Sequence, residues 1–258
     1  MTCRSLRRAH VALVFTCLLA GCSNYALPHH AYAPLLERGG QLEVRGSAGV
    51  NLGAGTPELV LEGQMAGSPV DGFVIAGGVT TSVIPGEKTS NHFDGELALG
   101  AYLADDPSLR AEVLAGCAVG YGTGFYFGEE GDARLWGTYT RPFVQGTLAG
   151  VTSNGFFTIG GGLRVAANFI GLNARDVAPV EDGPSFVMSG FREALHVDPF
   201  VTARFGDDVA RLEVGLGTSV MLLGSSAVGA LMNVWFNVAL RLRFDLAGPP
   251  TGSTAPSP

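Results

Sequence analysis

The 258-residue chain has few charged residues and almost no lysine. Charged residues make up 15% of the sequence, against about a quarter in ordinary soluble domains, and Lys88 is the one lysine in it. The formal net charge is −7, and no run of Lys or Arg follows the first ten residues, which argues against nucleic-acid binding. Apolar residues reach 47%, too many for a disordered chain, and four cysteines are too few for a disulfide-stapled scaffold.

Apolar runs long enough for a membrane-spanning helix are also missing. At the N-terminus, Arg4, Arg7 and Arg8 precede an apolar stretch at 11–18. This stretch is about half of the ~20 residues that a spanning helix needs. A basic start followed by a short apolar core is typical of a cleaved signal peptide, which we predict for residues 1–21.

The apolar stretch leads into Leu-Ala-Gly-Cys at positions 19–22. Small residues followed by Cys in this place resemble the lipobox of bacterial lipoproteins. The resemblance covers the first 22 residues and implies cleavage before Cys22 and lipidation of its thiol. Ser23, where an Asp often marks retention in the inner membrane, favours delivery to the outer membrane. The alternative is an ordinary signal peptide with an incidental cysteine.

After cleavage and lipidation, Cys117 is the remaining free thiol, so no intramolecular disulfide is expected. Its position between Ala115 and Val119 on an apolar face predicts a small buried side chain.

Alternation of polar and apolar residues dominates the chain between 41 and 246. It is clearest at 232–244, where the even positions are apolar and the odd ones hold mostly Asn and Arg. A period of two is the pattern of a β-strand with two different faces. We predict ten strands, with 8–12 possible, at 41–51, 58–66, 72–83, 92–103, 110–121, 139–150, 155–169, 195–205, 209–222 and 232–245.

The predicted fold is an all-β, closed antiparallel up-and-down transmembrane β-barrel. An even number of strands fits a bacterial outer-membrane barrel. Residues 22–40, with Pro28 and Pro34, are predicted to be a lipid-anchored tether, and the Pro-, Gly-, Ser- and Thr-rich residues 247–258 a disordered tail.

The connections between predicted strands alternate in length. Short ones fall near 67–71, 104–109, 151–154 and 206–208, and longer ones near 52–57, 84–91, 122–138, 170–194 and 223–231. Outer-membrane barrels have short periplasmic turns and longer external loops. This pattern predicts that both termini are periplasmic, with the N-terminus anchored there at Cys22.

All charged residues of the predicted strands share one face. If that face points inward, the lumen is filled by ion pairs and glycines rather than open, and the blank apolar face meets lipid. Phe73, Phe93, Tyr121, Phe157, Phe169, Phe205 and Phe244 then lie near the membrane interfaces. The predicted lumen charges are Glu43, Arg45, Glu62, Asp94, Glu96, Arg110, Glu112, Arg141, Arg164, Asp198, Arg204, Arg211, Glu213, Arg241, Arg243 and Asp245.

The alternative is a soluble periplasmic barrel with the faces reversed, anchored at Cys22 and binding an apolar ligand as lipocalins do. The scarcity of lysine, the loop asymmetry and the overall apolarity favour the membrane. Pro142 and Pro199 fall inside predicted strands, where a closed barrel has no free edge, so we expect bulges or a shifted register there.

In architecture the chain resembles small outer-membrane β-barrel lipoproteins. Tyr32-Ala-Pro34 and the following Leu-Leu-Glu-Arg-Gly, leading into the first strand, resemble the opening of such proteins, and the alternation over 41–246 is the larger part of the likeness. The resemblance implies no settled activity and no catalytic residues.

Residues with the chemistry of a catalytic site are few. His196 shares a strand face with Asp198 and Arg204 near the external rim, and His92 lies near the same rim. No His-x-Ser pair lies on a strand. We predict no catalytic residue, no metal site and no cofactor: Gly160–Gly162 precedes no helix, His29-His30 lacks other ligands, and the acidic loops 129–132 and 176–182 lack EF-hand spacing.

Three hypotheses follow from these residues. The first, which we prefer, is a structural or surface-interaction barrel in contact with outer-membrane lipids and with a surface ligand or protein bound through 122–138 and 170–194. The second is a lipid- or peptide-modifying enzyme acting at the rim around His92 and His196. The third is the soluble ligand-binding barrel.

Overall fold

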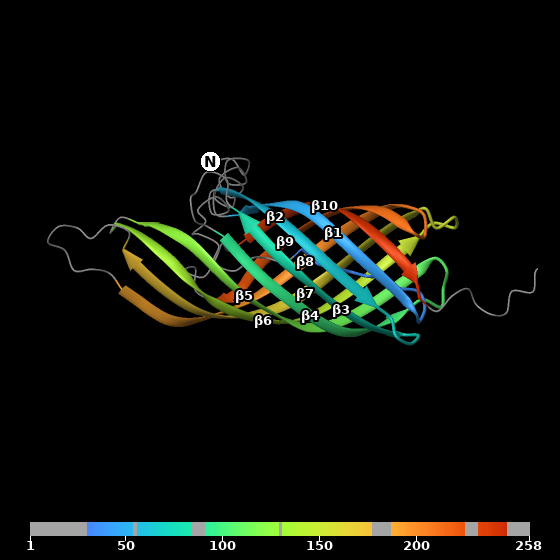
Figure 1. Ribbon diagram of the computed structural model, residues 1–258, viewed down its shortest axis with the longest axis horizontal. Helices are drawn as coiled ribbons and strands as arrows, with labels where there is room; N and C mark the ends of the chain where they lie inside the picture. The colour runs from blue at the N-terminus through green and yellow to red at the C-terminus, as the bar shows by residue number, and fades with distance from the viewer. Residues whose placement is uncertain are drawn as a thin grey trace, which may run out of the picture.

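The computed structural model describes residues 30–53, 56–83, 91–128, 131–176, 187–224 and 232–246. They form ten antiparallel strands, each paired with the next in the chain, and β10 pairs with β1 to close the barrel (Figure 1). The strands are β1 (Gln41–Gly53), β2 (Thr56–Gly67), β3 (Phe73–Val83), β4 (Asn91–Leu103), β5 (Leu109–Gly128), β6 (Gly131–Val151), β7 (Phe157–Asp176), β8 (Val187–Gly206), β9 (Ala210–Gly224) and β10 (Met232–Asp245). The predicted closed antiparallel barrel of ten strands is confirmed.

Within the described residues no helix is long and apolar enough to cross a membrane.

The closing pair joins the two most regularly alternating segments of the sequence. β1 and β10 pair without interruption from Gln41↔Asp245 to Leu52↔Val234. Residues of equal parity lie opposite each other in this register, so the polar faces of both strands point to the same side of the sheet. The closing pair therefore continues one polar face and one apolar face across both strands.

The polar face is the inner one. Glu43 and Arg45 on β1 are 2% and 1% exposed, whereas their outward neighbours Val44 and, across the pair, Leu240 are 39% and 54% exposed. Apolar side chains cover the outer wall, and a charge placed on such a wall at the membrane midplane costs about 2–4 kcal/mol. The reversed, soluble barrel with an apolar interior is therefore excluded.

Outward-facing aromatic residues lie near both ends of this wall. Phe93 and Tyr121 are exposed near one end, and Phe205 and Phe244 near the other. Cys117 also faces outward and is exposed, so the prediction that it is buried was wrong. It lies on the outer face of β5, where the surrounding medium rather than protein would cover it.

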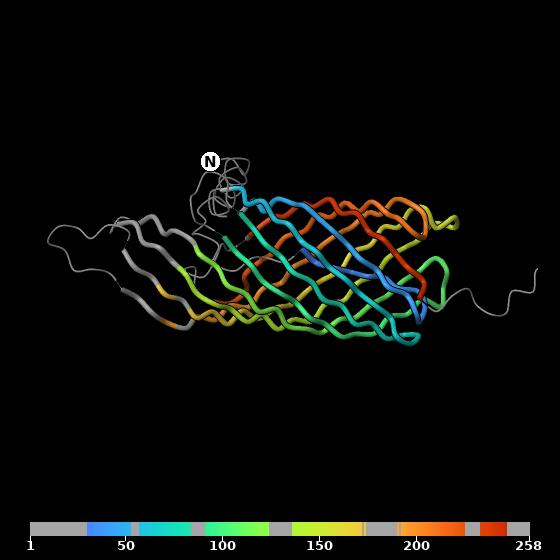
Figure 2. The backbone as a smooth tube through the Cα atoms, in the orientation of Figure 1, coloured from blue at the N-terminus to red at the C-terminus, as the bar shows by residue number. Residues whose placement is uncertain are grey.

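Four consecutive strands are longer than the other six and extend the barrel wall at one end. β5, β6, β7 and β8 have 20, 21, 20 and 20 residues, and the other strands have 11 to 15. The surplus carries this wall roughly 18 Å beyond the rest at a strand tilt of about 40°. Figure 1 shows the four strands projecting at the end opposite the short turns, and the coloured part of the tube in Figure 2 follows them past the ends of the other strands.

This projection corrects two predicted loops. Residues 122–128 and 131–138 belong to β5 and β6, and residues 170–176 and 187–194 belong to β7 and β8. Apolar alternation marks a strand only where one face meets a different medium from the other. Strands that leave the membrane lose that difference, which explains why the sequence pattern did not reveal them.

The short turns at the other end are held by aspartates. The Asp106 carboxylate accepts hydrogen bonds from the Ser108 hydroxyl and backbone N–H at 2.6 and 2.7 Å, which lower its pKa. Asp207 accepts from the backbone N–H groups of Ala210 and Val209, with the same effect on its pKa. Both turns therefore keep a charged carboxylate in place at neutral pH.

The two prolines affect the strands differently. Pairing of β6 with β7 skips Pro142 but resumes in the same register, without the expected bulge. In β8 the register against β9 shifts between Leu195 and His196, a few residues before Pro199. The expectation of a bulge or register shift thus holds near Pro199 and is wrong at Pro142.

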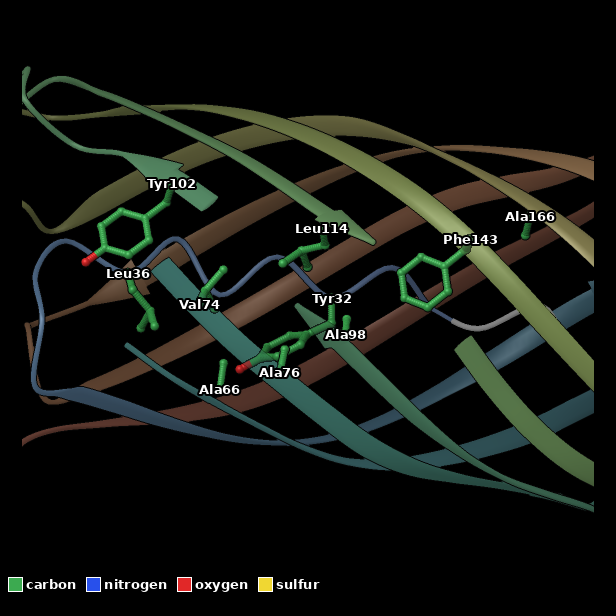
Figure 3. Packing of buried hydrophobic residues seen from close by; sticks show 10 residues of the cluster. All are labelled: Tyr32, Leu36, Ala66, Val74, Ala76, Ala98, Tyr102, Leu114, Phe143 and Ala166. Atoms are coloured by element: carbon green, nitrogen blue, oxygen red, sulfur yellow. The ribbon is translucent and has the colours of Figure 1, made fainter. Parts of the chain in front are cut away.

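Residues 30–40, which we call the plug segment, pass from the lumen to the turn end of the barrel, and residues 30–36 of this segment are buried inside it. Ala31, Tyr32, Ala33, Leu35 and Leu36 are all 0–3% exposed, and Figure 3 shows the trace of this segment running through the lumen. The segment reverses into β1 at Gly40, whose φ of +77° is in the left-handed region that favours glycine. This part of the predicted tether does not precede the barrel but fills it.

Candidate functional site

Arginine and amide side chains of the wall hold the carbonyl groups of the plug segment. Arg204 donates to the carbonyl of Ala33, and Arg241 donates to the same oxygen at 3.0 Å. Arg243 reaches the Leu35 carbonyl at 3.3 Å, and the amide of Gln145 donates to the Tyr32 carbonyl at 2.8 Å. The extended backbone thus finds in the wall the partners that a neighbouring strand would supply.

Carboxylates of the wall hold the donors of the same segment. The backbone N–H of Leu35 donates to Glu112 at 3.1 Å, and that of His30 donates to Glu62 at 3.2 Å. The Tyr32 hydroxyl donates to Glu43 at 3.2 Å. Because wall groups bind donors and acceptors alike, the plug segment is bound along its length through its main chain.

Two buried glutamates organise the charges around the plug segment. Glu213 accepts from Arg45 at 3.0 Å and Arg204 at 2.9 Å, and contacts Arg241 at 2.7 Å. Glu43 contacts Arg241 at 2.5 Å and Arg243 at 3.4 Å. Each carboxylate therefore offsets several guanidinium groups, as burial of so many charges requires.

The remaining predicted lumen charges form smaller groups. Arg164 and Glu96 make a two-pronged pair at 2.8 and 3.2 Å, with the guanidinium 4.1 Å from the centroid of the Phe143 ring. Arg141 contacts Asp198 at 2.5 Å. Further contacts lie between Arg45 and Glu62 at 3.1 Å, between Arg110 and Glu37 at 3.7 Å, and between Arg211 and Asp208 at 3.1 Å.

Apolar contacts fill the space that the charges leave. Tyr32 and Leu36 pack among Val74, Leu114 and Phe143 of the inner wall (Figure 3). Ala31, Ala33 and Leu35 form a second cluster with Ala149, Phe200 and Trp235. The side chains of the plug segment therefore form the hydrophobic core together with the inner wall, while its main chain makes hydrogen bonds to the wall.

The N-terminal end of the plug segment, at His30, packs against a glycine of β1. The ring of His30 lies 4.8 Å from that of Trp235, centroid to centroid. A Cβ on the inward-facing Gly49 would come within 2.6 Å of the His30 ring and 2.5 Å of the Phe236 carbonyl. Gly46, on the outer face of the same strand, has nothing within 4 Å of such an atom.

We expect Gly49→Ala to destabilise the folded barrel by about 1–3 kcal/mol, the usual cost of overpacking. Gly46→Ala is the matched control, because it adds the same methyl group to the same strand in open space. Urea titration of the heat-modifiable gel band measures both. Equal unfolding midpoints would show that His30 does not occupy the space beside Gly49.

The predicted rim residue His92 belongs to a buried group on β2, β3 and β4. Its Nδ1 lies 2.9 Å from Glu58 and 3.2 Å from the hydroxyl of Ser82, and Ser82 also donates to Glu58. His92 is among the residues that line an open hollow of about 570 Å³, but its side chain and Ser82 are each only 1% exposed. Serine and carboxylate share one ring nitrogen, whereas a catalytic triad uses the two nitrogens separately.

His196, the other predicted rim residue, is also linked to a serine and an acid. Its Nδ1 lies 3.2 Å from the Ser219 hydroxyl, which donates to Asp198 at 2.5 Å. The acid thus holds the serine rather than the histidine, so nothing in this chain of contacts activates the hydroxyl as a nucleophile. Within the described ranges no His, Cys, Asp and Glu group has the geometry of a metal site. Cys22, His29, Glu129, Glu130 and residues 177–186 lie outside them.

Several residues of the lumen were missed in the sequence. Glu58 shares the parity of Glu62 on β2, and including it would have found the carboxylate beside His92. Trp235 shares the parity of Arg241 but is apolar and was not singled out. Tyr32 and Leu36 carried a signal of another kind, because a solvated tether has no need of such large apolar side chains.

Comparison with known proteins gives likenesses of fold. No protein-family model and no curated protein sequence matches the chain. Among solved structures it is similar to the outer membrane protease OmpT of Escherichia coli, with 14% identity, a TM-score of 0.50, and 80% of this chain and 94% of the other covered. It is also similar to the translocator domain of the autotransporter NalP of Neisseria meningitidis, with 13% identity, a TM-score of 0.44, and 93% and 96% covered. The closed barrel and its apolar outer wall are those of an outer-membrane β-barrel, and the comparisons show a likeness of fold alone.

Proposed function

We propose that the protein is an outer-membrane barrel lipoprotein, lipidated at Cys22, that presents a contact surface outside the cell and does not conduct. The observation that carries this proposal is the plug segment, bound through its main chain and packed among buried side chains. A lumen filled in this way leaves a structural or surface-interaction role for the barrel.

The orientation of the proposed contact surface is supported by the short turns. Such turns are periplasmic in outer-membrane barrels, so the projecting ends of β5 to β8 lie outside. A wall of paired strands offers a surface ligand or protein a firmer platform than an isolated loop. Outer-membrane lipids surround the rest of the barrel.

A rim enzyme is the second candidate, because the structure joins both rim histidines to serine and carboxylate groups. The geometry disfavours it: the hydroxyls of Ser82 and Ser219 are buried and bonded to acids. If the barrel has this activity after all, Ser82→Ala and Ser219→Ala will abolish it while the barrel stays folded.

We expect an epitope inserted at 129–130 to bind antibody on intact cells, and one inserted at 207–208 to bind only after the outer membrane is opened. Both sites connect adjacent strands, so both insertions should leave the heat-modifiable band in place. The reverse accessibility would refute the proposed orientation. Binding at neither site on intact cells would refute the surface role.

A further inference from the structure

The inner wall remains polar between His30, the N-terminal end of the plug segment, and the rim opposite the short turns. Asn51 of β1 lies opposite Trp235 of β10, and the next inward residue of β10 away from the short turns is Asn233, near the beginning of that strand. These three side chains are 0%, 1% and 3% exposed. Neither polar atom of the Asn233 side chain has a hydrogen-bond partner, nor does Nε1 of Trp235 or the amide oxygen of Asn51.

These unpartnered atoms lie in line with the plug segment. The segment is at the turn end at Gly40, where it bonds to Ser68 and Leu246. Ten residues earlier, His30 lies against Gly49 and Trp235. Traced toward its N-terminus, the plug segment therefore climbs beside β1 and β10, away from the short turns, and is directed at the unpaired Asn and Trp groups.

We infer that residues 22–29 continue along this polar track and leave the barrel at the rim opposite the short turns. This inference rests on the proposed function for the direction of the barrel in the membrane. The processed N-terminus is then external, and the acyl groups of Cys22 enter the outer leaflet. The main chain of these residues supplies the donors and acceptors that Asn51, Asn233 and Trp235 lack.

Chain length separates this path from a return to the periplasm. From the level of Gly49, the end of β1 is about 10 Å away along the barrel axis, and the turn end about 20 Å away. Eight extended residues span at most about 28 Å. They reach the near rim with residues to spare. A return must first use several residues to reverse direction, and what remains falls short of the turn end.

Packing opposes the return as well. A second pass of the chain would cross the level where Tyr32, Leu36, Leu114 and Phe143 are in contact and 0–4% exposed. A section packed this tightly has no room for another backbone. A periplasmic N-terminus, which the sequence led us to expect, would need this return path, and the packing of the plug segment disfavours it.

Labelling of single cysteines on intact cells tests the exit. In a Cys117→Ser background, Asn24→Cys is treated with a membrane-impermeant maleimide before and after the outer membrane is opened. Ser226→Cys, between β9 and β10, reports the outside, and Asp208→Cys, in a short turn, reports the periplasm. The background chain without an added cysteine corrects for any unacylated Cys22.

We expect Asn24→Cys and Ser226→Cys to label to the same extent on intact cells, with Asp208→Cys at least tenfold lower until the membrane is opened. Labelling of Asn24→Cys only after opening, with Ser226→Cys labelled from outside, overturns the exit. Labelling only after denaturation overturns it too, since residue 24 then lies within the lumen. If Asp208→Cys labels from outside and Ser226→Cys does not, it is the proposed orientation that fails.

Discussion

Glu213→Gln is expected to destabilise the folded barrel by about 3–5 kcal/mol, the cost of removing one member of a buried ion group. Glu213 is 0% exposed and contacts Arg45, Arg204 and Arg241 within 3.0 Å. Glutamine keeps the shape of the side chain and removes its charge. Arg45 then keeps Glu62 at 3.1 Å and Arg241 keeps Glu43 at 2.5 Å, but Arg204 loses the carboxylate that it contacts.

Urea unfolding followed by the heat-modifiable band measures this loss. Asp208→Asn is the matched control: Asp208 also pairs with an arginine, but its side chain is 86% exposed, and such surface pairs contribute about 0–1 kcal/mol. Adding Arg204→Met to Glu213→Gln should recover part of the lost stability, because it removes one uncompensated charge. An unchanged midpoint for Glu213→Gln would show that the arginines do not depend on this carboxylate.

Removal of the plug segment has the second large expected effect. Deletion of residues 30–37 takes away the side chains of Tyr32, Leu35 and Leu36 and frees Arg204, Arg241 and Arg243 from the carbonyls that they bind. It keeps Arg38 and its contact with Asp245 at 2.7 Å, and so the turn into β1. We expect the intact protein to show no steady conductance in planar bilayers and the deletion variant to form water-filled channels.

Two further variants guard this experiment. Deletion of 247–254 removes the same number of residues from the other terminus and should stay silent. If the plug deletion fails to give a heat-modifiable band, Tyr32→Ala combined with Leu36→Ala keeps the main-chain contacts while opening the lumen, and smaller conductance is expected. A folded plug deletion that remains silent, or an intact protein that conducts equally, would contradict the plugging role.

The alternation of the sequence predicted the barrel because the membrane imposes a simple rule on it. The outward residues of β10 are apolar and its charged residues point into the lumen, so Leu240 and Arg241 reveal their places by type alone, whereas the inward Trp235 does not. The same rule also decided which face points inward. The rule holds only where a strand crosses the membrane. The outer parts of β5 to β8 lack this alternation and were therefore not predicted as strands.

The plug segment could not be predicted in this way. An extended chain in the lumen has no period, and its partners are far away in sequence: Gln145 is 113 residues from Tyr32, and Arg241 is 208 from Ala33. The lumen charges were visible as a set, but what they bind was not. The one sign in the sequence that this segment lies in the lumen is that Tyr32, Leu35 and Leu36 are large apolar residues with no other place to be buried.

Thiol reactivity within the plug segment tests most directly whether it fills the barrel. Ala33→Cys and Arg38→Cys, in the Cys117→Ser background, place a thiol at a residue 0% exposed and at one whose side chain is 48% exposed. In the folded, heat-modifiable protein, a small thiol reagent should modify residue 38 at least a hundredfold faster than residue 33, and the two rates should converge in denaturant. Equal rates in the folded barrel would contradict a lumen filled by its own N-terminal segment.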